Sequence, residues 1–526
     1  MSKYKRIAAF VIGTVVSCGL TFTMPNVAKA VSAPIDDWVT QDHDMNRTGL
    51  QLQNTGITKA NVNSLKLRWA VPLGELVYAS PIVANGTVYV STGKGNVYAL
   101  KVSDGKTIWK TNIGDYVRMT PTLADGLLFV GNYGLSNGAI SHTPPVSANM
   151  TALDVKTGKI VWKTSVPGIV RGEPVVVNGV VYEGIAGGDT WNGCIAGHIA
   201  AFDEHTGKLL PKTWYTSPKP KNGGGIFSPI SYDASSKTLY FGTGNTCDET
   251  GTQNSIVAIS SLDMKTRWVV SGDKPTTHEE ALKEEAGGGI DVGCGITIRG
   301  DRVYCKSKSG FLYALDKNTG KKLWETDLQP YGGVGSAGIG TATGDGTMLM
   351  VNSGERQYRG HNDGLTSFVA FDLAGHMKYV LQEQNTISLA LSAAFIPGIG
   401  FVSLDNSLIA FDSQTGQKLW SSATQDSFYA SPAIVASGLY DVDTSGNVYA
   451  YALPAVTSII GTPGVVALQN LNNPEIINNP SNGQHWKRIL FGVVFGLGAI
   501  ICAVTIFFTR RAKKIPEPQS KPQHQS

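Results

Sequence analysis

The chain has 526 residues, of which 61 are glycine and only 16% are charged. This composition excludes a disordered chain, a coiled coil and a long helical bundle, and it is typical of many short strands joined by tight turns. The formal net charge is +4, but it is unevenly distributed. Residues 1–30 and 487–526 together hold 11 of the 44 cations and one of the 40 acids. Residues 31–486 therefore hold 33 cations and 39 acids, a net charge of −6. That acidic central region lacks the electrostatic basis for binding nucleic acid.

Residues 1–30 have the pattern of a secretory signal peptide. Three cations lie within the first six residues, residues 7–16 are apolar, and Ala28, Lys29 and Ala30 form a small-x-small cleavage pattern. We expect export of the chain and cleavage after Ala30. The alternatives are lipoprotein processing at Cys18, which follows a loose lipobox, and an uncleaved N-terminal helix.

Residues 31–454 carry one repeat eight times. The clearest copies end in a tryptophan and contain a glycine turn, which in two of them reads D-x-x-T-G-K; Asp starts this turn and Gly supplies a positive φ. They lie at 96–109, 150–162, 311–324 and 407–420; weaker copies lie at 198–211, 255–268 and 367–380, which end in Pro211, Trp268 and Val380, and a half-copy lies at 447–454. Strand pairs such as 80–92, 173–184 and 392–404 precede the copies, so each unit consists of four short strands.

A four-stranded sheet cannot bury both of its faces alone, and radial stacking of such sheets gives a β-propeller. The half-copy lacks its tryptophan strand, and residues 65–71 carry the missing strand at the other end of the repeats. We therefore predict an all-β fold, an eight-bladed β-propeller whose last blade is closed by an N-terminal strand and whose tryptophans pack between blades. Two β-sandwich domains would not explain the split final repeat.

The C-terminal part predicts a membrane anchor. Residues 455–486 are rich in Asn, Pro and Gly and have the composition of a linker. Residues 489–509 form a stretch of 21 residues without a charge, long enough to cross a bilayer as a helix, and four cations follow within 510–514. Because cationic flanks favour the cytoplasm, we expect a single-pass cell-membrane protein with an extracytoplasmic propeller and a cytoplasmic tail at 510–526.

Four cysteines remain in the predicted exported region. They are Cys194, Cys247, Cys294 and Cys305, and in an oxidising compartment they allow three sets of two disulfides. The sequence has no C-x-x-C-H motif, so we expect no covalent c-type haem.

Several motifs point to one family. The opening segment 37–49, the tryptophan repeats, S-P-I-S-Y-D…Y-F-G-T-G-N at 228–245 and K-S-G-F-L-Y-A-L-D at 308–316 together resemble the quinoprotein alcohol dehydrogenase-like family. Its members are eight-bladed propellers with tryptophan-docking repeats. The resemblance covers about 37–454 and implies the cofactor pyrroloquinoline quinone (PQQ) together with Ca²⁺. The same propeller also serves non-catalytic members, such as outer-membrane assembly lipoproteins.

The resemblance implies a metal site. Asn245 takes the place of the family's calcium-binding Asn, and an amide oxygen suits Ca²⁺. The third protein ligand of the family, a Glu, falls at Asn192 by direct counting or at Asp189 if a gap is allowed. The other interpretation of Asn245 is a turn residue in a glycine-rich hairpin.

The resemblance also implies three residues around the quinone. Asp291 takes the place of the catalytic base, Lys308 that of the cation at a quinone carbonyl, and Phe227 that of a Trp that stacks under the ring. The alternatives are a loop Asp, a solvated hairpin Lys and an ordinary core Phe. Two features depart from the family pattern: no Cys-Cys pair occurs, and Asp125 stands where the family has an Arg, which removes a cationic contact to the cofactor.

Two functions follow from these patterns. The first is a membrane-anchored, extracytoplasmic PQQ-dependent dehydrogenase that oxidises an alcohol, polyol or sugar and passes electrons to an external acceptor, a membrane quinone or a soluble cytochrome. The second is a non-catalytic propeller that binds proteins or glycans at the cell surface, which the departures from the family pattern favour. An extracytoplasmic sensor is a weaker third interpretation, because only 17 residues follow the predicted membrane helix.

Overall fold

The computed structural model describes residues 37–134, 147–186, 196–218, 224–244, 252–272, 291–328, 340–352, 366–383, 392–404, 406–424 and 426–454. The chain separates into two units, Met1–Ala455 and Val456–Ser526, and every described residue lies in the first. The predicted signal peptide, linker, membrane helix and tail therefore lie outside the described residues. Among the residues that are described, no helix has the length and apolar character needed to span a membrane.

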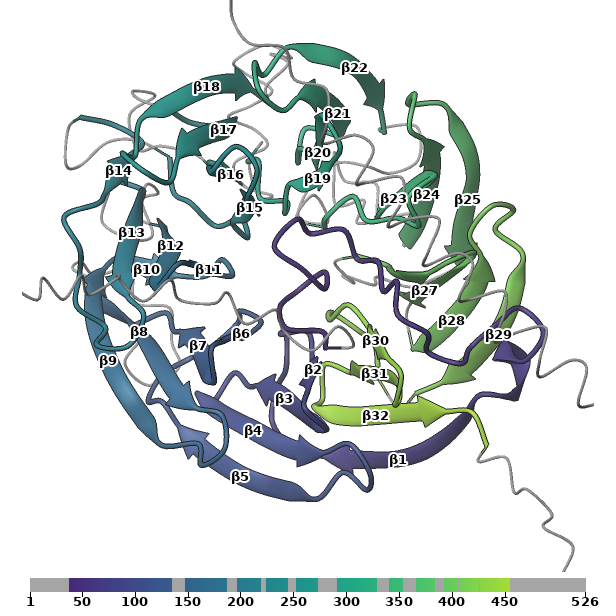
Figure 1. Ribbon diagram of the computed structural model, residues 1–526. Coiled ribbons are helices and arrows are strands. Elements are labelled where there is room, and N and C mark those ends of the chain that lie inside the picture. The colour runs from purple at the N-terminus through teal and green to yellow at the C-terminus, as the bar shows by residue number, and fades with distance from the viewer. Residues whose placement is uncertain are drawn as a thin grey trace, which may run out of the picture. The chain divides into compact units, whose positions relative to one another are not determined.

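Eight antiparallel sheets follow one another around a ring in the first unit (Figure 1). The first four blades consist of β2 (Ile82–Ala84), β3 (Thr87–Ser91), β4 (Asn96–Lys101) and β5 (Thr107–Asn112); β6 (Thr122–Ala124), β7 (Leu127–Gly131), β8 (Ser147–Asp154) and β9 (Ile160–Pro167); β10 (Ile169–Val170), β11 (Val175–Val177), β12 (Val180–Ala186), β13 (His198–Asp203) and β14 (Trp214–Tyr215); and β15 (Ser231–Asp233), β16 (Thr238–Gly242), β17 (Ser255–Ser260) and β18 (Thr266–Ser271). The other four consist of β19 (Thr297–Arg299), β20 (Arg302–Lys306), β21 (Phe311–Asp316) and β22 (Lys322–Asp327); β23 (Met348–Asn352), β24 (Thr366–Asp372) and β25 (Met377–Glu383); β26 (Ala394–Ile396), β27 (Ile399–Leu404), β28 (Ser407–Asp412) and β29 (Lys418–Ala423); and β30 (Ala433–Val435), β31 (Gly438–Val442) and β32 (Asn447–Ala452) with β1 (Lys66–Pro72), which a short 3-10 turn, η1 (Val62–Ser64), precedes. The predicted eight-bladed all-β propeller is confirmed.

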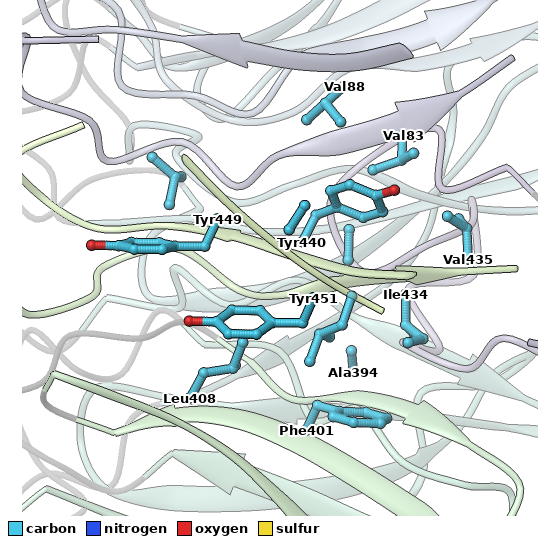
Figure 2. Packing of buried hydrophobic residues seen from close by; sticks show 14 of the residues in the cluster. Val83, Val88, Ala394, Phe401, Leu408, Ile434, Val435, Tyr440, Tyr449 and Tyr451 are labelled. Atoms are coloured by element: carbon cyan, nitrogen blue, oxygen red, sulfur yellow. The ribbon is translucent and has the colours of Figure 1, made fainter. Parts of the chain in front are cut away.

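The ring closes where the sequence predicted, because β1 pairs with β32 in antiparallel register, with Lys66 opposite Ala452 and Pro72 opposite Asn447. Figure 1 shows the purple N-terminal strand beside the yellow-green C-terminal strand. Figure 2 shows the apolar packing at this closure, where Tyr440 and Tyr451 of the last blade lie among side chains of the two neighbouring blades. Strands far apart in sequence thus share one core.

Each tryptophan docks onto the following blade. The indole N–H of Trp162 donates to the Glu204 carbonyl at 2.8 Å, and its ring lies so close to Gly207 that a Cβ there would be 2.5 Å from ring atom Cδ2. Gly207 has a φ of +68°, so glycine serves both the turn and the close approach. Trp69, Trp109, Trp268 and Trp324 repeat this contact with Gly105, Gly158, Gly320 and Gly375.

In two weak repeats the residue at the docking position is not the one that the sequence spacing predicts. Tyr379, and not Val380, takes the tryptophan position: its hydroxyl donates to the Ser413 carbonyl at 2.6 Å, and its ring packs on Gly416. The turn after Asp372 is shorter by one residue than the one after Asp316, because the Asp372 N–H bonds to residue 376 whereas the Asp316 N–H bonds to residue 321. In the other copy Trp214, beyond Pro211, donates to Thr266 at 2.8 Å.

Docking by tryptophan predicts a large loss of stability when one ring is removed. We expect Trp162→Ala to lower the free energy of unfolding by about 3–5 kcal/mol, because a large buried side chain is lost and a cavity remains. Trp162→Phe should cost less, since it keeps most of the ring and loses only the hydrogen bond. Denaturant unfolding measures both, with Leu262→Ala, 63% exposed, as the neutral control. Equal stability of Trp162→Ala and the control would contradict the docking role.

The N-terminal segment 37–50 crosses the centre of the ring, as the purple trace in Figure 1 shows. Its backbone bonds to the inner strands of several blades: Trp38 pairs with Val83 of β2, Met45 accepts from Tyr232 of β15, and Leu50 bridges to Phe395 of β26. The buried guanidinium of Arg47 donates to the Ile230 carbonyl at 2.9 Å. This segment therefore ties the inner strands together and forms part of the floor of the site.

Candidate functional site

A pocket lies among the loops that lead into the inner strands, above the N-terminal segment. Its walls are Gln41, Arg118, Arg171, Glu173, Phe227, Pro229, Asp291, Gly293, Lys308 and Tyr429. Three residues predicted from the sequence, Phe227, Asp291 and Lys308, line this one pocket, although 81 positions separate the first from the last. Their predicted roles remain predictions, but the fold brings them together.

Asp291 and Lys308 form a nearly buried ion pair. The Lys308 Nζ lies 2.6 Å from Asp291 Oδ2, and the two side chains are 11% and 9% exposed. The Lys308 backbone N–H also donates to the Asp291 carbonyl at 3.0 Å. Because the segment before β19 and the turn after β20 meet through both contacts, the carboxylate has a defined position at the pocket.

A disulfide joins the same two segments. Cys294, three residues after Asp291, is bonded to Cys305, three residues before Lys308, and both cysteines are buried. This settles one pairing that the sequence left open. Cys194 and Cys247 lie outside the described residues.

Phe227 lies against two glycines. A Cβ at Gly225 would be 2.8 Å from the Phe227 ring atom Cζ, and a Cβ at Gly244 would be 2.4 Å from ring atom Cε2 and 3.0 Å from Asp291 Oδ1. The Gly244 N–H donates to the Gly225 carbonyl at 2.7 Å. The absence of side chains at both positions therefore lets the ring lie beside the carboxylate.

The predicted metal ligands Asn245, Asp189 and Asn192 all lie outside the described residues. Gly244, the residue before Asn245, contacts both Phe227 and Asp291, so the T-G-N motif leads directly to the pocket. In the described part of the chain, no group of three His, Cys, Asp or Glu residues is arranged to hold a metal ion. Asp291 lies beside this motif, because a Cβ on Gly244 would be 3.0 Å from its Oδ1.

Two arginines that the sequence analysis missed line the pocket. The Arg118 guanidinium donates to the Tyr429 hydroxyl at 2.9 Å and lies 4.6 Å from the centre of the Tyr78 ring. The Arg171 guanidinium lies 5.4 Å from the centre of the Phe227 ring. Neither makes an ion pair with a carboxylate among the described residues. Asp125, where the sequence analysis noted a lost cationic contact, is instead exposed in the β6–β7 turn.

The repeat contains a signal that would have found both arginines. Several inner strands follow a proline, and in three blades the residue three positions before that proline lines the pocket: Arg118 precedes Pro121, and Arg171 precedes Pro174. Tyr429, three residues before Pro432, lines the pocket in the same way. Comparing this position across the blades predicts part of the pocket wall without a structure.

Two buried carboxyl groups lie near these cations: Glu173 lines the pocket, and Glu183 interacts electrostatically with Glu173. Burial raises the pKa of Glu173 to about 7 against the opposing effect of Arg47, and the Glu173 Oε1 accepts the Thr120 N–H at 3.1 Å. Burial also raises the pKa of Glu183, whose carboxyl oxygens have no hydrogen-bond partner in the described structure. Burial therefore disfavours the negative charge of both carboxyl groups, whereas Arg118 and Arg171 contribute positive charge to the pocket wall.

Comparisons with known proteins agree with the propeller fold. The chain is 27% identical over 423 residues to a polyvinylalcohol dehydrogenase of Sphingopyxis sp. (strain 113P3), an alignment covering 69% of this chain and 63% of that protein. The chain thus spans less than two thirds of that relative. The fold matches the quinohemoprotein alcohol dehydrogenase of Comamonas testosteroni (TM-score 0.63, 18% identity, 80% of each chain) and BamB of Moraxella catarrhalis (TM-score 0.55, 15% identity, 74% of this chain and 99% of that one).

A family model described as "Outer membrane protein assembly factor BamB" matches residues 53–143, 145–281 and 252–398, which is more than half of the chain. The matched residues include Phe227 and the blades that carry the tryptophan docking. The chain therefore belongs to the PQQ-repeat, quinoprotein alcohol dehydrogenase-like family of β-propellers.

Proposed function

We propose that the protein is a PQQ-dependent dehydrogenase that oxidises an alcohol, polyol or sugar. The observation that carries the proposal is one pocket in which a nearly buried Asp–Lys pair, an aromatic ring and two arginines that form no ion pair with a described carboxylate meet. Cations that line a pocket favour an anionic ligand, and PQQ is a flat quinone with three carboxylates. The chemistry of the wall therefore fits this cofactor.

The residues divide into distinct roles. Phe227 would pack on the face of the quinone, Lys308 would bind a quinone oxygen, and Arg118 and Arg171 would pair with the carboxylates. Asn245, with Asp189 or Asn192, would hold Ca²⁺, whose preferred ligands are oxygens. When bound, PQQ accepts two electrons from the substrate while Ca²⁺ acts as a Lewis acid.

Asp291 is the group that handles the substrate proton. As a carboxylate with an ammonium partner at 2.6 Å, it can accept the hydroxyl proton of an alcohol as the carbon is oxidised. Lys308 fixes the direction of the carboxylate, and the close approach of Gly244 limits its movement. Electrons then leave to an external acceptor. We also propose export and anchoring through the apolar stretch 489–509, on the sequence pattern alone.

The second candidate function is a non-catalytic propeller that binds proteins or glycans. The family model described as an outer membrane assembly factor and the structural likeness to BamB favour it. The buried Asp291–Lys308 pair favours the enzyme, because a surface used only for binding has no need of such a pair at the base of a pocket.

Cofactor binding distinguishes the two functions. We expect the full chain, purified in detergent, to bind one PQQ in the presence of Ca²⁺ and then to reduce a dye with an alcohol, polyol or aldose from a substrate panel. Asn245→Ala should weaken binding only when Ca²⁺ is present, and the exposed Asn63→Ala serves as the control. Absence of stoichiometric PQQ binding would contradict the enzyme function and favour the non-catalytic propeller. Equal PQQ binding by the wild-type protein and Asn245→Ala in the presence of Ca²⁺ would exclude Asn245 from the metal site.

A further inference from the structure

Arg171 and Phe227 belong to neighbouring blades, yet a close backbone contact fixes their separation. Arg171 follows β10, and Phe227 precedes β15. A Cβ on Gly172 would lie 2.5 Å from the Ser228 carbonyl oxygen and 3.3 Å from that of Phe227, so the two loops touch backbone to backbone. Only glycine permits this approach, and the attachment points of the two side chains are therefore set by the framework.

The side chains of Phe227 and Arg171 differ in conformational freedom. Gly225 and Gly244 press against the Phe227 ring and hold it in place, whereas among the described residues no hydrogen bond or ion pair holds the Arg171 guanidinium. Both side chains are partly exposed, in keeping with their place on the pocket wall. Phe227 is thus a rigid surface, and Arg171 is a planar group that can change its distance from that surface.

A flat molecule fits between Arg171 and Phe227 after a small movement of the guanidinium. The guanidinium carbon lies 5.4 Å from the ring centre. A flat ring between two planar groups needs two contact distances of ~3.5 Å, so the guanidinium must retreat by ~2 Å, which its long side chain allows by a change of rotamer. Guanidinium stacks on aromatic faces through both its charge and its plane, and a lysine ammonium has no plane.

We propose that Arg171 and Phe227 form the two faces of a slot that holds a flat anionic ring, with the guanidinium stacked on the ligand opposite Phe227. The inference rests on the proposed function in that PQQ is such a ring. It goes further in assigning Arg171 a stacking contact as well as a charge, and in predicting that flat polycarboxylates other than PQQ also bind.

Isothermal titration calorimetry of the full chain tests the slot with three probes: PQQ with Ca²⁺, the flat benzene-1,3,5-tricarboxylate, and citrate, which has three carboxylates but is not flat. The variants are Arg171→Lys, which keeps the charge, and Arg171→Ala, with Arg267→Lys on the exposed outer strand β18 as the matched control. We expect Arg171→Lys to weaken binding of both flat probes by ~10-fold, to leave citrate unchanged, and to account for most of the loss seen with alanine.

The possible outcomes distinguish failure of the slot hypothesis from failure of the proposed function. Full binding of PQQ by Arg171→Lys, with loss only in Arg171→Ala, would show a contact of charge alone and would overturn the slot while leaving the cofactor assignment intact. Binding of the benzene tricarboxylate but not of PQQ, with loss in Arg171→Lys, would support the slot and reject PQQ as the ligand. Failure of the wild-type protein to bind either flat probe would overturn both.

Discussion

Asp291→Asn is expected to lower the turnover of alcohol oxidation by about 10²–10⁴-fold, because the amide cannot accept the substrate proton. The variant keeps the size of the side chain and a hydrogen-bond acceptor for Lys308, whose Nζ lies 2.6 Å from the present carboxylate. Cofactor binding should therefore fall far less than turnover. Dye-linked kinetics at saturating PQQ and Ca²⁺ separate the two effects.

A second buried ion pair provides the control for this variant. Asp233 lies 2.8 Å from Lys317, and the side chains are 9% and 15% exposed, close to the values of the Asp291–Lys308 pair. Asp233→Asn should reduce stability without reducing turnover, since this pair does not line the pocket. Equal losses of turnover in the two variants would show that Asp291 acts through stability, and the base would have to be sought elsewhere.

Gly244→Ala is expected to abolish high-affinity PQQ binding. The added methyl group would lie 2.4 Å from the Phe227 ring and 3.0 Å from Asp291 Oδ1, so the ring, the carboxylate or the backbone must move. Overpacking of this kind costs about 1–3 kcal/mol of stability, and the displaced groups are those proposed to bind cofactor and metal. Calorimetric titration with PQQ and Ca²⁺, together with denaturant unfolding, measures both losses.

The control is Gly126→Ala in the exposed β6–β7 turn, where the added methyl group would meet nothing within 4 Å. Because Gly126 has a φ of +82°, this variant should lose some stability and no binding. The double variant Gly244→Ala/Phe227→Ala gives a further test: it opens space for the methyl group, so stability should recover relative to Gly244→Ala alone. No recovery would mean that the methyl group clashes elsewhere.

The repeats made the fold predictable from the sequence. A tryptophan eight residues after the turn aspartate, as in Trp162 after Asp154, and a glycine in the turn are local patterns, and their recurrence fixes the number of blades. The split final repeat likewise predicted the pairing of β1 with β32. Spacing failed where a turn changed length: the shorter turn before Tyr379 moves the docking position by one residue, which counting along the sequence could not detect.

The site was predictable only where a local motif surrounds the residue. Lys308 lies in a K-S-G-F motif and Phe227 lies six residues before Asp233 of the S-Y-D motif, so both could be placed by comparison with a family pattern. Arg118 and Arg171 lie outside the motifs of that family pattern, and the loss of a cation at Asp125 gave no indication that other blades supply cations to the same pocket. Their convergence depends on how the ring closes.

The sequence by itself determined the eight-bladed ring, its closure and the candidates Phe227, Asp291 and Lys308, because repeats and motifs are patterns of residues close together in the chain and the split final repeat marks the two ends that must meet. The tertiary structure alone decided that Cys294 pairs with Cys305, that Lys308 pairs with Asp291, and that Arg171 faces Phe227. These contacts join different segments, and in some cases different blades, so they follow from the distances between inner strands around the central axis and have no counterpart in the spacing of residues along the chain.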